Sequence, residues 1–156
     1  MPSSSADHAD VLAPAPIMYA AAILVGLAAE YTQPLWRLPP TVSLWLGIAI
    51  IAASIPIVLA AVKALGRAQT AFDARKPTNT IVTDGAYRYS RNPTYVSLTL
   101  LHIGVALVLG SVWVLLMVIP AVLLTHRGVI LREERYLEAK FGQEYLRYKA
   151  AVRRWL

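Results

Sequence analysis

Residues 93–126 read PTYVSLTLLHIGVALVLGSVWVLLMVIPAVLLTH, and this stretch decides what kind of fold the chain can adopt. Three of its 34 residues carry ionisable side chains: Tyr95, His102 and His126. One helix of this length would measure about 51 Å at roughly 1.5 Å per residue, which is too long for a single crossing of a bilayer core about 30 Å thick. Gly110 and Ser111 lie near the middle, so the stretch predicts a tight hairpin of two membrane helices, 93–109 and 112–130.

Two further runs upstream are apolar enough to cross a membrane. Residues 11–29 carry no charged side chain, and residues 41–62 form a second uncharged run. A spanning helix needs about 20 apolar residues, so each run predicts one crossing. Together with the hairpin, these runs predict an all-α integral membrane protein with about four transmembrane helices. We expect a disordered tail over residues 1–14 and a single membrane-embedded domain over residues 15–156.

The composition supports a membrane protein and excludes several functional classes. Hydrophobic residues make up 57% of the chain and charged residues only 15%, whereas about 25% charged residues is usual for soluble domains. Cysteine is absent, which excludes disulfide scaffolds, thiolate metal sites and cysteine nucleophiles. The three histidines lack metal-ligand spacing and no glycine-rich phosphate loop occurs. Neither a metal site nor a soluble nucleotide-binding Rossmann domain is therefore expected.

The positions of the positive charges predict the orientation in the membrane. The net charge is +6, which in an apolar chain indicates contact with anionic membrane lipids rather than with nucleic acid. Of the 15 lysines and arginines, Arg37 alone lies between the first two spans, six lie in residues 63–92 and eight follow residue 126. Four crossings place the last two groups on one face, which the positive-inside rule makes cytoplasmic. We expect an integral protein of the bacterial cytoplasmic membrane with both termini in the cytoplasm.

Two polar segments, 66–92 and 127–156, hold the side chains that could do chemistry at that face. The first is too long to be a mere connector, and a solvated loop anchored at the lipid headgroups is its alternative interpretation. In the second, Glu134 lies on an apolar helical stripe, where a purely solvated helix would not need a carboxylate. Gly142 is expected to end this helix. A short amphipathic helix, Gln143–Trp155, completes the predicted cytoplasmic helical segment, with an interfacial helix as its alternative role.

The two polar segments resemble a known family. The sequence DGAYRYSRNPTY over residues 84–95 resembles the GPYRxxRHPxY segment of the isoprenylcysteine carboxyl methyltransferase and phospholipid methyltransferase superfamily. Residues 133–154 are similar to the EExxLxxxFGxxYxxYxxxVxR ending of the same family. The resemblance runs from Thr83 to Trp155 and includes the helical hairpin between the motifs. Asn92 stands where the family usually has His, and unlike histidine it cannot take up a proton.

The resemblance implies a membrane-embedded methyltransferase that uses S-adenosylmethionine, with the cofactor held by about residues 83–156. The cofactor carries an ammonium group, for which Glu134 is the carboxylate on an apolar face, and a carboxylate, for which Arg91 and Asn92 offer donors. Tyrosines would supply a wall for the adenine. The expected cofactor-binding residues are Tyr87, Arg91, Asn92, Pro93, Tyr95, His126, Glu133, Glu134 and Tyr148. The candidate catalytic residues are His126 and Arg154.

Asn92 and Tyr95 lie three residues apart at the start of the predicted helix 93–109. This spacing places them on one helical face, which predicts that both line the cofactor pocket while Thr94 points elsewhere. The alternative is that Asn92 only caps the helix, a role that an Asn–Pro pair suits well.

The expected methyl acceptor is a lipid-like or isoprenoid molecule. A carboxylate or thiol fits best, because an anionic acceptor needs no base, whereas an amine would need one such as His126. The acceptor would arrive laterally between the third and fourth spans, where Ser97, Gly104 and Gly110 leave room, unless these small residues serve tight helix packing instead. Two other functions stay open: an NADPH-dependent membrane reductase of the sterol-reductase type and a non-catalytic membrane relative.

Overall fold

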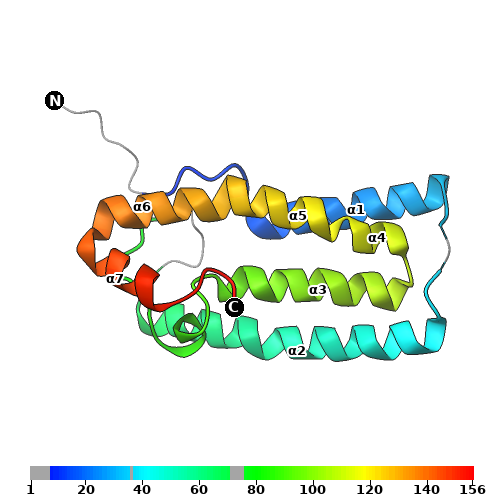
Figure 1. The fold of residues 1–156 in the computed structure, drawn as a ribbon, viewed down its shortest axis with the longest axis horizontal. Coiled ribbons are helices and arrows are strands. Elements are labelled where there is room, and N and C mark those ends of the chain that lie inside the picture. The colour runs from blue at the N-terminus through cyan, green and yellow to red at the C-terminus, as the bar shows by residue number, and fades with distance from the viewer. Residues whose placement is uncertain (1–7, 36, 71–75) are drawn as a thin grey trace.

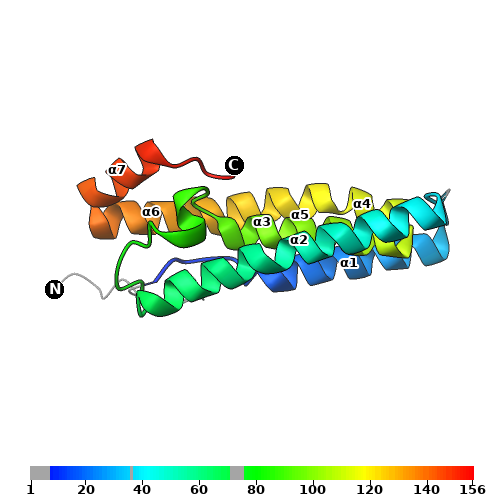
Figure 2. The same cartoon turned by 90° about the horizontal axis from the view of Figure 1, so that it is seen from below.

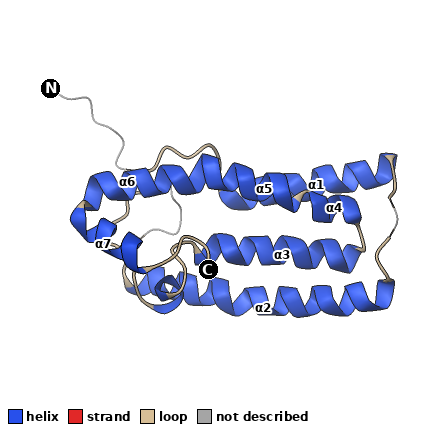
Figure 3. Cartoon of the chain, viewed as in Figure 1, coloured by secondary structure: helices blue, strands red, loops and turns tan. Residues whose placement is uncertain are grey.

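The computed structural model describes residues 8–35, 37–70 and 76–156, and every regular element in these ranges is helical. The elements are α1 (Ala15–Thr32), α2 (Pro40–Arg67), the 3₁₀ turn η1 (Gly85–Arg88), α3 (Pro93–Leu109), α4 (Val112–Leu116), α5 (Val118–Thr125), the π-helical turn η2 (His126–Ile130), α6 (Leu131–Phe141) and α7 (Gln143–Ala151). The long helices lie side by side in one bundle (Figures 1 and 3). The expected all-α class is confirmed for the described ranges.

Within the described residues, three helical stretches are long and apolar enough to cross a membrane. They are α1, α2 and the run Val112–Phe141, which includes α4, α5, η2 and α6. Helix α3 is also apolar but has only 17 residues, so the fourth crossing that we expect would have to be made by this shorter helix. The polar elements η1, α6 and α7 gather with the C-terminus at one end of the bundle, far from the turn between α3 and α4 (Figures 1 and 2).

The turn predicted between the last two spans is confirmed. Helix α3 ends at Gly110, whose backbone is left-handed with φ 63°, a conformation that glycine adopts without a steric penalty. Ser111 then caps the next helix, because its Oγ accepts a hydrogen bond from the Val114 N–H at 3.2 Å. The following helical run is interrupted at Met117, three residues before Pro120. Proline has no N–H to donate to the preceding turn, which explains this interruption.

Ser97 and Gly104 pack α3 against α2 and do not open a passage toward the fourth span. The Ser97 hydroxyl donates a hydrogen bond to the Ser54 carbonyl oxygen of α2 at 2.9 Å. A Cβ atom added to Gly104 would lie 2.6 Å from Ile51 Cγ1 and 2.9 Å from the Gly47 carbonyl oxygen. The prediction of a lateral passage at these residues is therefore wrong. Small residues at this interface let the two backbones approach closely, which is how membrane helices gain packing contacts.

The Gly104→Ala substitution is expected to lower the free energy of unfolding by about 1–3 kcal/mol, since the added methyl group overpacks the α2–α3 interface. Gly66→Ala is the matched control. Gly66 also lies in a helix, but nothing lies within 4 Å of the position of its Cβ, so alanine should be neutral or stabilise by up to about 1 kcal/mol. Thermal unfolding of the detergent-solubilised proteins measures both. Equal unfolding temperatures for the two variants would contradict the packing role of Gly104.

The segment before α1 is packed against the bundle, which corrects the expected disordered tail for residues 8–14. Ala9 is only 1% exposed, and the Leu12 N–H donates a hydrogen bond to the Gly128 carbonyl oxygen at 3.1 Å. Residues 1–7 of the expected tail lie outside the described residues. The sequence gives no sign of this packing, because the acceptor carbonyl lies more than 100 positions further along the chain.

The last helix is shorter than predicted. Gly142 does end α6, with φ 53°, and a helix starts directly after it as expected. This helix ends at Ala151 rather than at Trp155, and Val152 is already extended. The backbone beyond it leaves the helix because its carbonyl groups bond to the segment before α3, as described below.

Candidate active site

A cavity of about 280 Å³ lies at the end of the bundle where the two polar segments meet. It brings together seven of the nine residues that we expected to bind a cofactor: Tyr87, Arg91, Asn92, Tyr95, Glu133, Glu134 and Tyr148. The charged and aromatic part of the wall thus comes from η1, the start of α3, α6 and α7. Apolar residues between 9 and 16, together with Leu65 of α2, form another part.

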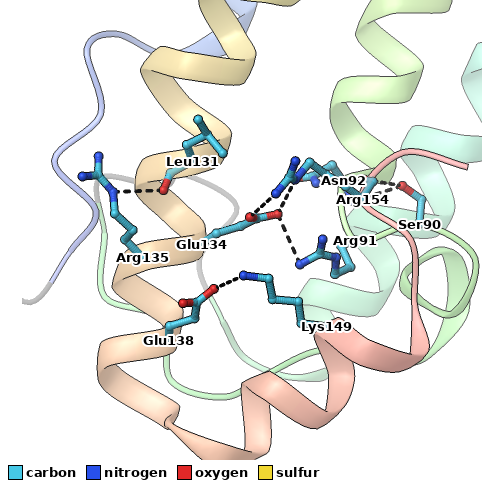
Figure 4. Close-up of polar contacts among 9 residues, drawn as sticks. All are labelled: Ser90, Arg91, Asn92, Leu131, Glu134, Arg135, Glu138, Lys149 and Arg154. Atoms are coloured by element: carbon cyan, nitrogen blue, oxygen red, sulfur yellow. Dashed lines mark hydrogen bonds and ion pairs between the residues drawn. The ribbon is translucent and has the colours of Figure 1, made fainter.

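Glu134 lies at the centre of a buried cluster with two arginines, shown in Figure 4. Its Oε1 and Oε2 accept hydrogen bonds from Arg154 Nε and Nη2, both at 2.8 Å. Arg91 Nη1 lies 3.2 Å from Oε1. The side chains of Glu134 and Arg91 are each only 7% exposed, and that of Arg154 is 33% exposed. Both carboxylate oxygens are thus held by arginines, and the cluster carries a formal charge of +1 that favours an anionic ligand.

The C-terminal segment after α7 forms hydrogen bonds with the residues that lead into α3. The Arg91 N–H donates to the Arg153 carbonyl oxygen at 2.9 Å. The Arg154 carbonyl oxygen accepts hydrogen bonds from Asn92 Nδ2 at 2.9 Å and from the Ser90 hydroxyl at 3.3 Å. Asn92 does occupy the N-cap position of α3, but its side chain makes no capping hydrogen bond. It holds the C-terminal segment instead, and this contact keeps Arg154 beside Glu134.

Tyrosines surround the charged groups of the cavity. The Tyr148 hydroxyl donates to the Tyr87 carbonyl oxygen at 2.7 Å, and the Tyr95 hydroxyl donates to Glu133 Oε2 at 2.6 Å. Tyr145 packs edge-on against Tyr148 with 6.2 Å between ring centroids. Burial raises the pKa of both Tyr87 and Tyr145 to about 12. These phenols therefore stay neutral near pH 7, where they can donate hydrogen bonds but cannot serve as anionic bases.

Three of the expected residues do not line the cavity: Pro93, His126 and Arg154. Pro93 is the first residue of α3. The His126 ring stacks on Trp155 with 6.4 Å between centroids, and its Nδ1 is buried without a hydrogen-bond partner in the described part of the chain. Hydrogen bonding to Glu134 raises the pKa of Arg154 above its already high value. Arg154 therefore stays charged, which leaves it unable to accept a proton and suits it to positioning Glu134.

Thr94 lines the cavity together with Tyr95, although we predicted that it would point elsewhere. The prediction used a single helical face, but η1 and α6 both pack around this first turn of α3. The Tyr87 side chain from η1 interacts with Thr94, so two adjacent sides of the turn border the cavity. Helical spacing alone could not show this, because it does not say how many neighbours surround a helix end.

Several lining residues were missed by the sequence analysis. Tyr145 belongs to the FGxxY motif, so the motif itself was a signal, although we assigned this tyrosine no role in the pocket. Thr78, Thr80 and Val82 come from the long segment before η1, and nothing in their pattern distinguishes them from a solvated loop. Residues 9–16 gave no signal either, since an apolar run before a membrane helix reads as part of the span.

Comparison with known proteins identifies the family. A profile described as phospholipid methyltransferase matches residues 42–144, about two thirds of the chain. An uncharacterized protein of Haemophilus influenzae is 50% identical over 62 residues, which are 40% of this chain and 98% of that protein. No solved structure matches the chain. The matched residues include Arg91, Asn92, Glu133 and Glu134. As the resemblance of its two motifs predicted, the chain belongs to the phospholipid methyltransferase family.

Proposed function

We propose that this protein transfers a methyl group from S-adenosylmethionine to a lipid-like or isoprenoid acceptor at the membrane surface. The observation that carries the proposal is the single cavity that joins charges of both signs, a set of tyrosines and an apolar wall within one end of a membrane bundle. An amino-acid zwitterion needs opposite charges close together, adenine needs an aromatic or apolar surface, and a lipid needs an apolar approach. The cavity lining supplies the first two, and its apolar residues would contact the lipid-like acceptor.

The lining residues fit the cofactor with one change from the expectation. Glu134 already binds two arginines through both of its oxygens, so its role is to hold Arg91 toward the cofactor carboxylate. Glu133 lines the same cavity one residue earlier and would bind the cofactor ammonium. Tyr87, Tyr145 and Tyr148 would border the adenine. When bound, the cofactor supplies an activated methyl group.

The residues of this chain would act by alignment and by exclusion of water. Methyl transfer is a displacement at carbon, so the protein gains most by holding the two reactants in line in a dry site. The neutral tyrosines and the charged arginines of the site are poor bases, Glu133 would be paired with the cofactor ammonium, and His126 lies outside the cavity lining. This arrangement supports an acceptor that is already anionic, a carboxylate or a thiolate, because such an acceptor needs no proton removed.

We further propose that the cavity faces the cytoplasm of a bacterial cell, with both termini on that side. Both polar segments, which carry thirteen of the fifteen positive charges, lie at the cavity end of the bundle where the structure describes them (Figure 1). Positive residues are retained on the cytoplasmic side during membrane insertion, and they also attract the anionic lipids of that leaflet. Membrane lipids are therefore its expected surroundings, and nucleic acid is not an expected partner.

Calorimetry of the detergent-purified protein tests the proposed function. S-adenosylhomocysteine, the product form of the cofactor, should bind saturably, and NADPH should not. Binding of NADPH alone would indicate the reductase alternative, and binding of neither would indicate a non-catalytic relative. The acceptor class follows from transfer of a tritiated methyl group into a lipid extract. A methyl ester of a carboxylate releases labelled methanol in mild base, whereas a methyl thioether keeps its label.

A further inference from the structure

Residues 9–16, which we call the strap, run along the outside of η2 and the start of α6 and end in the first turn of α1 (Figure 1). Six of its eight residues line the cavity: Ala9, Val11, Ala13, Pro14, Ala15 and Pro16. The other two point away from it. The Asp10 side chain is 99% exposed and Leu12 is 63% exposed. The strap thus presents an apolar face to the cavity and a separate outer face.

Two contacts hold the strap in place. The Leu12 N–H donates to the Gly128 carbonyl oxygen at 3.1 Å, and Gly128 lies in the π-helical turn η2. A Cβ atom on Gly128 would lie 2.8 Å from Leu12 Cδ1, so the Leu12 side chain packs directly on this glycine. At the other contact, Arg132 Nη1 donates to the Asp10 carbonyl oxygen at 2.7 Å and lies 3.5 Å from Asp10 Oδ2.

The strap lies outside residues 42–144, the part of the chain that matches the family profile. Its contribution to the cavity is therefore a property of this chain that family membership does not supply. An apolar wall at this place separates the charged residues of the cavity from bulk water. Exclusion of water strengthens the ionic contacts to a bound cofactor and protects the reacting methyl group.

We propose that the strap is part of the cofactor-binding site, that Val11 and Ala13 border the bound ligand, and that Arg132 keeps the strap closed over it. This inference rests on the proposed function, because the ligand it invokes is the cofactor. It adds to that function a set of binding residues from before the first membrane helix.

The absence of cysteine from the chain allows a direct test by chemical labelling. Ala13→Cys places a thiol on the cavity face of the strap, and Leu12→Cys places one on its outer face at the neighbouring position. Each single-cysteine protein is labelled with a maleimide with and without S-adenosylhomocysteine. At about 100 times the dissociation constant, the ligand should slow labelling of Ala13→Cys by about tenfold or more. Labelling of Leu12→Cys should change less than about twofold, because its side chain does not border the cavity.

A second test separates closure of the strap from general effects of charge on α6. Arg132→Gln removes the charged contact to Asp10. Arg135→Gln removes a charge from the same helix at a side chain that, among the described residues, bonds only to the Leu131 carbonyl of its own helix (Figure 4). If only the closed form binds well, Arg132→Gln should raise the dissociation constant of S-adenosylhomocysteine about 3- to 10-fold. Arg135→Gln should leave it unchanged.

The results of the labelling and binding experiments either support or overturn the assignment of the strap to the cofactor site. Protection of Ala13→Cys alone, together with weaker binding by Arg132→Gln alone, supports it. Equal protection at both positions, or no protection although calorimetry shows binding, would overturn the assignment of the strap to the site. Equal effects of the two arginine substitutions would remove the closing role of Arg132. If the unmodified protein bound no S-adenosylhomocysteine, the proposed function itself would fail and the inference with it.

Discussion

Glu134→Gln is expected to lower the free energy of unfolding by about 3–5 kcal/mol and to weaken binding of S-adenosylhomocysteine more than about 100-fold. Glutamine keeps the size of the side chain but removes its charge. Arg91, whose side chain is 7% exposed, would then be a buried charge without its counter-charge. Arg154 would keep at most one of its two hydrogen bonds at 2.8 Å, because glutamine has one acceptor oxygen, and the attachment of the C-terminal segment to α6 would weaken. Thermal unfolding and calorimetry in detergent measure the two effects.

Glu138→Gln is the matched control for this substitution. Glu138 lies one helical turn further along α6 and pairs with Lys149, but both side chains are about one third exposed. Because solvent screens such a pair, the same chemical change should cost less than about 1 kcal/mol and leave binding intact. If Glu134→Gln kept the unfolding temperature of the unmodified protein and lost only affinity, Glu134 would contact the ligand directly and would not be the group that holds the arginines.

Glu133→Gln is expected to weaken binding of S-adenosylhomocysteine about 10- to 150-fold. A hydrogen bond to a charged group contributes roughly 1.5–3 kcal/mol, and this is the contribution expected from pairing Glu133 with the ligand ammonium. The glutamine oxygen can still accept the hydrogen bond that the Tyr95 hydroxyl donates to Glu133. The contact with Tyr95 should therefore be preserved while the charge in the cavity is lost.

A second ligand tests whether Glu133 contacts the ammonium group of the cofactor. 5′-Methylthioadenosine contains the adenosine and a thioether but lacks both the ammonium and the carboxylate. The Glu133→Gln protein should bind it as well as the unmodified protein does, because the missing group is the one that Glu133 would contact. Equal losses for both ligands would indicate a general change of the cavity. Unchanged affinity for S-adenosylhomocysteine would show that Glu133 does not bind the ammonium.

The helices and their ends were predictable because they depend on neighbours in sequence. The 34-residue apolar run is too long for one crossing, and its only glycine–serine pair supplies both a left-handed residue and a cap at 110–111. Gly142 ends α6 for the same local reason. The convergence of Arg91, Glu133 and Glu134 was predictable from the motifs, which lie at the two ends of a hairpin and must therefore return to the same side of the bundle.

Only the tertiary structure decided which partners these residues meet. The sequence and its motif predicted that Glu134 binds the cofactor. In the structure, its two carboxylate oxygens contact Arg91 and Arg154 instead. Gly104 was as compatible with a passage as with packing, and the approach of Gly47 settles the matter. Helical spacing predicts which side chains share a face of a helix, but it does not predict which other helix packs against that face.

The strap and the C-terminal segment show most clearly that sequence patterns do not reveal the partners of a segment. The amino-acid sequence by itself determined that the chain forms membrane helices with polar ends, since hydrophobicity, proline and glycine act over a few residues. That residues 9–16 line a cavity depends on the Gly128 and Arg132 contacts. That the last helix stops at Ala151 depends on the carbonyl bonds to residues 90–92. Contacts between residues far apart in the chain form only once the helices have packed, so only the tertiary structure could decide them.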